Sequence, residues 1–233
     1  MSLLSPGFSS TRASNDWTNL RRPAECRVIA AGRRRFLLLA RIGAKSRHAK
    51  RFAQFGECSA IAFPPTEIFG ERYIEIATGT LFGPRLTLTA GFGPDQVLPH
   101  GPVVTIGHRC VIGQGNAIVG MSSIAIGDDV WTGHNVYITD FNHGYEDLDV
   151  PPGLQMSAPR PVSIGDGVWL GNGVTVLGGA SIGKHAVIGA GSVVTGTIPD
   201  YSVAVGNPAR VIRQHIPGNG WVRVDPSTSM PVH

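Results

Sequence analysis

The chain has 233 residues, of which 15% are charged and 31 are glycine, and its formal net charge is +4. This composition is too apolar for a disordered chain and too rich in glycine for a helical bundle. The three cysteines match no zinc-binding spacing, so we expect no metal site and reduced thiols in a cytoplasmic protein. We also expect no binding to nucleic acid. No apolar run reaches the roughly 18 residues that a membrane-spanning helix needs.

Residues 1–67 are predicted to form an N-terminal tail and a basic helical segment. The pattern from Arg33 to Phe55 suits a short helix, whose basic side chains lie between Arg33 and Arg51. The run that starts at Arg33 resembles a twin-arginine export signal, but Arg41 interrupts its apolar part and no cleavage site follows. We expect instead a surface segment that chemistry does not need, and that could contact the anionic inner face of a membrane.

From about residue 68 to residue 213 the sequence repeats every six residues. This period belongs neither to an α-helix nor to a single strand, and it is typical of a solenoid. Glycine, asparagine or aspartate recurs three residues after each aliphatic position, where a corner with positive φ is expected. The sequence therefore predicts an all-β triangular prism with three repeats per coil, and an earlier coil through Ile76, Phe82 and Leu88. The aligned core positions are Ile106, Ile112, Ile118, Ile126, Thr132, Ile138, Ile164, Leu170, Val176, Ile182, Ile188 and Val194.

Two segments break the repeat, and residues 214–233 are predicted to be a C-terminal tail. Residues 89–103 are rich in glycine and proline and are predicted to loop out. Residues 140–162 interrupt the register a second time, and a long loop inside a regular solenoid is usually functional.

The repeat resembles that of the hexapeptide-repeat acyltransferases, whose coils form a left-handed parallel β-helix. The segment VYITDFNHGY resembles the active-site loop of the sugar O-acetyltransferases of this family, which include maltose, galactoside and exopolysaccharide acetyltransferases. The resemblance implies that His143 is the general base and that Asn142 and Tyr145 contact the acceptor. A further expectation is that Asp140 orients the ring of His143. Many relatives carry a second histidine where this chain has Phe141.

The resemblance also implies a site for acetyl-CoA or another short acyl-CoA. Trp169, in GVWLGNG, matches a tryptophan beside the acceptor, and a backbone N–H near Gly171 or Asn172 is expected to stabilise the oxyanion. The last coil and its exit, IGAGSVVTGTIPDYSVAVGNPARVIR, are similar to the family's coenzyme-binding end. Gly196 departs from the family, where many relatives have a lysine that binds cofactor phosphates, and Lys184 is a candidate substitute. The coenzyme-binding residues that the resemblance implies are Gly171, Asn172, Ala190, Thr195, Arg210 and Arg213.

The predicted activity is transfer of an acyl group, most simply acetyl, from coenzyme A to a carbohydrate hydroxyl by a homotrimer. The acceptor could instead be the amine of an amino sugar or an antibiotic. The same solenoid occurs in γ-class carbonic anhydrases, but His108, His134 and His143 lack the close pair of histidines that their zinc needs. A non-catalytic scaffold is a further alternative, since solenoids can assemble without catalysing a reaction.

Overall fold

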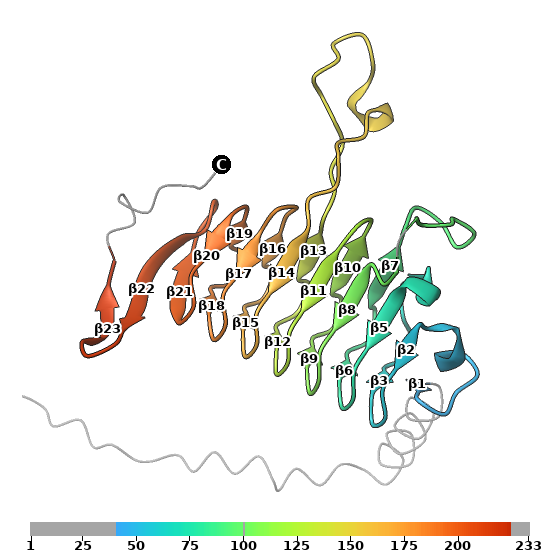
Figure 1. Ribbon diagram of the computed structural model, residues 1–233, viewed down its shortest axis with the longest axis horizontal. Coiled ribbons are helices and arrows are strands. Elements are labelled where there is room, and N and C mark those ends of the chain that lie inside the picture. Colours follow the sequence, from blue (N-terminus) through green and yellow to red (C-terminus); the bar gives the residue numbers. More distant parts are fainter. Residues whose placement is uncertain (1–40, 100, 225–233) are drawn as a thin grey trace, which may run out of the picture. The chain divides into compact units, whose positions relative to one another are not determined.

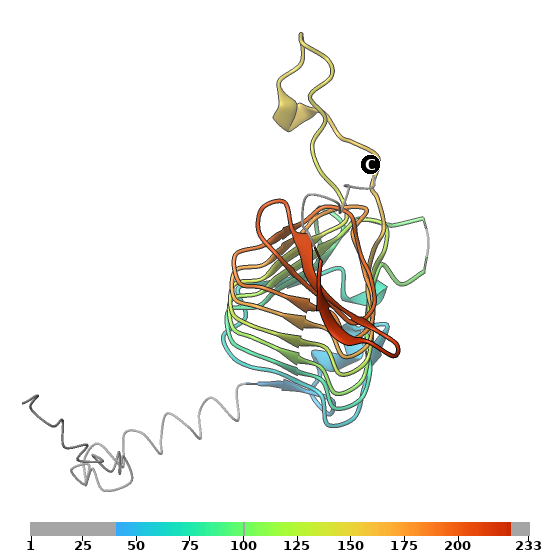
Figure 2. The same ribbon diagram turned by 90° about the vertical axis from the view of Figure 1, so that its left-hand side faces the viewer.

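The computed structural model describes residues 41–99 and 101–224, which form one prism with three parallel sheets as its faces (Figures 1 and 2). We label the sheets A, B and C. Along the chain each coil passes from sheet B to sheet A and then to sheet C, which defines edge BA, edge AC and edge CB of the prism. The coils wind left-handed, as predicted. Within the described residues, no helix is long and apolar enough to cross a membrane.

The strands are short, and each pairs with the equivalent strand of the coils before and after it. Sheet A contains β1 (Ile42–Gly43), β3 (Ala60–Ile61), β6 (Leu81–Phe82), β9 (Val111–Ile112), β12 (Trp131–Thr132), β15 (Trp169–Leu170), β18 (Val187–Ile188), β21 (Ser202–Val205), β22 (Arg210–Ile216) and β23 (Gly220–Arg223). Sheet B contains β2 (Gln54–Phe55), β5 (Ile74–Ile76), β8 (Val104–Ile106), β11 (Ile124–Ile126), β14 (Val162–Ile164), β17 (Ser181–Ile182) and β20 (Thr197–Ile198). Sheet C contains β4 (Glu67–Phe69), β7 (Thr87–Ala90), β10 (Ala117–Gly120), β13 (Tyr137–Thr139), β16 (Thr175–Val176) and β19 (Val193–Val194).

The six-residue repeat predicts the core correctly, because all twelve aligned positions are buried. In sheet B the register stacks identical side chains in one column: Ile76, Ile106, Ile126, Ile164, Ile182 and Ile198. Thr132, the one polar member of the twelve, accepts hydrogen bonds from the backbone of Gly113 and the side chain of Asn116. A buried polar group that keeps its partners costs little, so the coil tolerates this exception.

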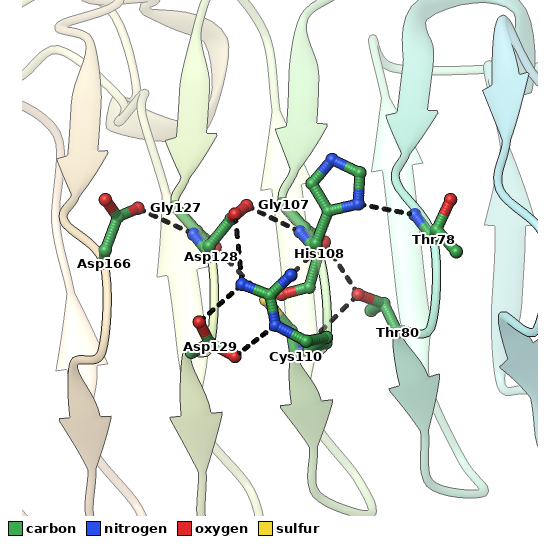
Figure 3. A network of polar contacts seen from close by, with 10 residues as sticks. Thr78, Thr80, Gly107, His108, Cys110, Gly127, Asp128, Asp129 and Asp166 are labelled. Atoms are coloured by element: carbon green, nitrogen blue, oxygen red, sulfur yellow. Dashed lines mark hydrogen bonds and ion pairs between the residues drawn. The ribbon is translucent and has the colours of Figure 1, made fainter.

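The corners adopt positive φ at the predicted residues, among them Asp129 and Asn135. They do so also at Arg109, His185 and Tyr201, where the rule favouring Gly, Asn and Asp predicts no such corner. At Arg109 the guanidinium binds Asp129, with N–O distances of 2.6 and 2.7 Å, and this contact helps to hold the turn (Figure 3). The same hydrogen bond and charge lower the pKa of Asp129.

Backbone amides along edge BA bind carboxylates of the next coil (Figure 3). The N–H of Asp128 donates to Asp166 and the N–H of His108 donates to Asp128, both at 2.8 Å. Further along, the N–H of Lys184 donates to Asp200 at 2.9 Å. These acids serve the stacking of the coils.

Every long departure from the repeat leaves the prism at edge CB. Residues 91–103 connect β7 to β8, and residues 140–161, which we call the arm, connect β13 to β14. The arm stands out from the body in both views and contains the 3-10 helix η4 (Pro152–Leu154) (Figures 1 and 2). Both predicted interruptions thus lie along one edge of the solenoid.

The N-terminal prediction is wrong where the structure describes it. Residues 33–40 lie outside the described residues, and residues 41–55 hold β1, the 3-10 helix η2 (Ala49–Arg51) and β2 in place of the predicted helix. Ala49 and Phe52 are buried, and Glu71, in the 3-10 helix η3 (Glu71–Tyr73), is buried beside Arg51 and His48. The basic segment between Arg33 and Arg51 is therefore partly structural, because its end closes the first coil.

The solenoid also extends past both predicted boundaries. The strands β2, β3 and β4 form a first coil that begins before residue 68 and contains Pro64 and Pro65. At the other end, β22 pairs antiparallel with β21 and continues past residue 213, and β23 pairs antiparallel with β22. The segment predicted as a tail is thus ordered in a hairpin as far as residue 224.

Candidate active site at edge CB

The ring of His143 is held by the arm itself. Its Nδ1 lies 3.1 Å from the carbonyl oxygen of Gln155, and the two strands of the arm meet in a single antiparallel bridge between His143 and Met156. A carbonyl oxygen only accepts, so this contact needs a proton on Nδ1, and in a neutral ring Nε2 is then the nitrogen that can accept one. The side chain of His143 is exposed.

Gln155 organises the arm around this histidine. Its side-chain amide donates to the carbonyl oxygens of Asp147, at 2.7 Å, and Val150, at 2.6 Å. Its side-chain oxygen accepts from the N–H of Asp147, and its backbone oxygen also accepts from the N–H of Gly144. The ring of His143 is therefore positioned by contacts within the arm.

Asp140 does not orient His143, contrary to the sequence prediction. It is fully buried, and its two carboxylate oxygens accept three backbone N–H groups, from Met121, Ser122 and Ser123, at 2.6–2.8 Å. These contacts fasten the base of the arm to the turn between β10 and β11. Asp140 is thus an anchor of the arm, and the orienting acceptor is the carbonyl of Gln155.

A cavity of about 280 Å³ lies where the arm leaves the prism. Arm residues form one side, including His143, Asn142 and Tyr145, and the next coils form the other through Leu177, Gly178 and Thr195. The predicted base, the predicted acceptor contacts and one predicted coenzyme contact thus meet in one hollow. The backbone N–H of Thr195 has no acceptor among the described residues, so it is free to bind a ligand.

Phe141 also lines this cavity, and its ring packs edge-on against Phe92 at 5.3 Å. Phe92 belongs to residues 91–103, the other loop at edge CB. At the position where many relatives have a histidine, this chain therefore has an apolar contact between the two loops.

Trp169 lies elsewhere in the protomer. It is on the outer surface of sheet A, 56% exposed, directly beside Trp131 of the preceding coil, and both line a shallow hollow of about 220 Å³. The predicted acceptor contact and the predicted base are therefore on different parts of one protomer.

Gly171, Asn172 and Ala190 lie at edge AC, away from the arm's edge of the prism. Of the two oxyanion donors that the prediction named, the N–H of Gly171 is not free, because it donates to the carbonyl of Ile188 at 2.8 Å. The N–H groups of Asn172 and Ala190 have no acceptor in the described part of the chain. His134 is at the same edge, one coil before Asn172. The backbone N–H of His134 donates to the side-chain oxygen of Asn172 at 2.8 Å.

Arg210 and Arg213 are on β22. Arg210 is half-buried and donates to the carbonyl of Ala209. Arg213 is exposed, directly opposite Arg223 of β23, with its guanidinium 5.9 Å from the ring centre of Trp221. Like charges directly opposite on a sheet are destabilising, and within residues 41–99 and 101–224 neither arginine forms an ion pair.

Lys184 cannot stand in for the missing lysine at Gly196. It is at edge BA, 4.0 Å from a carboxylate oxygen of Asp200 and over the ring of Tyr201, whereas Gly196 is at edge CB. The three histidines considered for zinc are also on three different edges of the protomer. The described residues contain no group of three potential metal ligands.

Sequence reasoning missed Gln155 and Arg160. Gln155 acts through backbone contacts that no motif marks. Arg160 lines the same cavity as His143, and a basic residue between a loop and the next repeat carries no signal of its own.

Comparisons with known proteins agree with this architecture. Residues 161–196 match the family model for the bacterial transferase hexapeptide, and residues 103–140 match that for the hexapeptide repeat of succinyl-transferase. A probable acetyltransferase of Mycobacterium tuberculosis is 41% identical over 119 residues, 51% of this chain and 40% of that protein. A protein of Escherichia coli described as a lipopolysaccharide biosynthesis O-acetyltransferase, WbbJ, is 40% identical over 105 residues, 42% of this chain and 54% of that protein. Residues 103–140 and 161–196 are thus similar to the hexapeptide repeats of bacterial transferases, and the chain spans about half the length of the curated relatives it matches.

Solved structures share the fold. An N-acyltransferase variant from Bacillus cereus, AntD, in complex with dTDP and coenzyme A, superposes with a TM-score of 0.60 at 19% identity, over 72% of this chain and 87% of that one. A hexapeptide-repeat acetyltransferase from Vibrio cholerae with bound acetyl coenzyme A gives 0.52 at 21% identity, over 82% and 89%. At these identities the likeness establishes the left-handed β-helix and nothing finer.

Proposed function

We propose that the chain is an acyl-CoA-dependent O-acyltransferase, most simply an O-acetyltransferase, that acts on a hydroxyl of a carbohydrate or glycoconjugate. The observation that carries the proposal is the cavity at edge CB, which joins His143 to the free N–H of Thr195. The description of the related E. coli protein as an O-acetyltransferase favours a hydroxyl acceptor. The N-acyltransferase among the similar structures keeps an amine acceptor as the alternative.

In this mechanism Nε2 of His143 takes the proton of the acceptor hydroxyl as its oxygen attacks the thioester carbonyl carbon. The C–S bond then breaks, and the thiolate receives the proton from the imidazolium, which returns His143 to its starting state. The carbonyl of Gln155 stabilises the imidazolium in between, because it accepts from Nδ1 throughout. No covalent acyl-enzyme is needed.

The active unit in this proposal is a homotrimer. Trp169, Asn172 and Ala190 are separated from the arm of their own protomer, so one site can combine these groups with His143 only if a second copy supplies part of it. The exposed surfaces of Trp131 and Trp169 are large apolar areas that such a neighbour would cover. The free N–H of Asn172 is then the candidate oxyanion donor.

The phosphates of coenzyme A are assigned to Arg213 and its neighbour Arg223. An anion between two like charges relieves their repulsion, and guanidinium groups bind phosphate well. Trp221 offers an aromatic surface beside them. These side chains supply positive charge that Gly196 does not.

The exposed basic residues of the described N-terminal part, among them Arg41, Lys45 and Arg47, are proposed to hold the enzyme at the inner face of a membrane. Binding to anionic vesicles that is lost at high salt would support this localisation.

The proposed function is tested by incubating the full chain with acetyl-CoA and a panel of sugars and amino sugars. Thiol release is followed, and the acylated product is identified by mass spectrometry. Acylation of a hydroxyl supports the proposal, acylation of an amine selects the alternative, and no acceptor-dependent thiol release contradicts both. Light scattering of the active sample checks the trimer, and a stable, active monomer would contradict the shared site.

A further inference from the structure

Arg160 stands at the end of the arm with its backbone fixed on both sides. Its N–H donates to the carbonyl of Asp140 at 2.6 Å, and its carbonyl accepts from the N–H of Gly179 at 3.0 Å. Because Asp140 is itself held by three amides, the backbone of Arg160 is fastened to the prism at the base of the arm.

The guanidinium of Arg160 lies against the bare backbone of Gly179. A Cβ placed on Gly179 would come within 2.5–2.7 Å of three atoms of the guanidinium group, so any side chain there would displace it. Gly179 has φ +88, which also disfavours other residues. The local structure thus leaves room for an arginine head at this point of the cavity wall.

The positive charge of Arg160 has no carboxylate partner among the described residues. The ion pairs there involve His48, Arg51, Arg109 and Lys184. Two carboxylates share the cavity with it, but Asp140 is occupied by three backbone N–H groups. Glu146 accepts the N–H of Tyr145 at 2.9 Å, and the backbone hydrogen bonds lower its pKa.

Nine of the twelve residues that line the cavity come from the arm, and His143 and Arg160 are both among them. At about 280 Å³ the hollow is at the lower end of the range of roughly 300–1,000 Å³ for small-molecule sites. A ligand whose hydroxyl meets His143 here would therefore lie in the same hollow as a guanidinium that has no carboxylate partner among the described residues.

We propose that Arg160 recognises an anionic group on the acceptor, so that the preferred acceptor is an acidic sugar bearing a carboxylate or a phosphate. A guanidinium binds either group through two parallel hydrogen bonds and leaves a neutral sugar without this contact. The inference rests on the proposed function only in assigning this cavity to the acceptor.

The test compares Arg160→Gln and Arg160→Lys with the wild type and with Arg85→Gln, an exposed control outside the cavity. Equilibrium binding of glucuronate, glucose 6-phosphate and glucose is measured without coenzyme, and KM is then measured for each sugar and for acetyl-CoA. Arg160→Gln is expected to weaken glucuronate or glucose 6-phosphate about 10- to 100-fold, with glucose and acetyl-CoA unchanged and Arg160→Lys intermediate. The anionic sugar that loses more affinity in Arg160→Gln shows whether Arg160 prefers a carboxylate or a phosphate.

Equal effects on charged and neutral sugars, or no effect, would overturn the inference. A rise confined to the KM for acetyl-CoA would also overturn it, because Arg160 would then serve the cofactor. If the acidic sugar binds through Arg160 but is never acylated, the inference stands and the proposed function fails. If the anionic sugars are acylated as well by Arg160→Gln as by the wild type, the proposed function stands and the inference fails.

Discussion

In the coils, side chains at equivalent positions stack on copies of themselves, whereas in the arm every contact is made once. The isoleucine column of sheet B repeats one packing arrangement from β5 to β20, and losing one member leaves the others in place. In the arm, Gln155 alone holds Asp147, Val150, Gly144 and His143. Packing is therefore spread over the coils, whereas the contacts that position His143 are concentrated in the arm.

The comparison predicts the largest effect at His143. His143→Ala is expected to lower kcat about 10²- to 10⁴-fold, the range for a positioned proton acceptor, with little change in the KM for acetyl-CoA. His134→Ala is the matched control at edge AC and should retain most activity. Steady-state kinetics and a circular dichroism spectrum of each variant check this, and a loss below tenfold in both would place the proton acceptor elsewhere.

The second prediction contrasts a leucine of the coils with one of the arm. Leu170 is fully buried, so Leu170→Ala should lower the free energy of unfolding by about 2–5 kcal/mol. Leu154 is 77% exposed, so Leu154→Ala should change it by less than about 0.5 kcal/mol. Urea unfolding measures both, and equal costs would contradict the separation of roles.

The third prediction divides the basic N-terminal segment. Removal of residues 1–40 should leave the thermal midpoint and the turnover of a soluble acceptor nearly unchanged. Removal of residues 1–51 also deletes β1 and the partners of the buried Glu71, so the midpoint should fall by about 2–4 °C for each kcal/mol lost. Differential scanning calorimetry measures the midpoint of each truncation. Identical midpoints would show that β1 and the partners of Glu71 do not contribute to stability.

The fourth prediction concerns the terminal hairpin. Arg213→Gln should raise the KM for acetyl-CoA about 3- to 10-fold and leave kcat nearly constant. A phosphate contact that is equally strong in the ground state and in the transition state affects binding alone. Arg223→Gln should behave alike if both arginines face one anion. An unchanged KM in both variants would remove the phosphates from this face.

The smallest effect is expected at edge BA. Arg109 lowers the pKa of Asp129, so the pair stabilises the fold above the ordinary carboxyl value of 3.8 and loses this contribution as the pH falls through the lower native value. Wild type and Arg109→Gln should therefore differ slightly in stability at pH 7 and converge below about pH 4. Since both groups are exposed, added salt should shrink the difference at pH 7 as well.

The sequence predicts the coils well because each buried position is dictated by its place in a six-residue period. It predicts the first coil poorly, because Gln54–Phe69 is held by pairing with the next coil and not by its own repeat pattern. The role of Asp140 depends on a turn 17–19 residues earlier that the winding of the solenoid brings beside it, so a local motif cannot reveal it. Arg160 gains its significance in the same way, from the cavity that the fold creates around it.

The two ends of sheet A bear on self-association. At one end β1 pairs antiparallel with β3, and at the other β22 pairs antiparallel with β21, the last strand of the parallel stack, and β23 pairs antiparallel with β22. A bare parallel coil would offer the same hydrogen-bonding edge as every coil inside the stack and could template another molecule end to end. Because β1 covers one end and the β22–β23 hairpin covers the other, the parallel coils of this sheet do not present a bare edge to a second copy, which opposes growth into filaments.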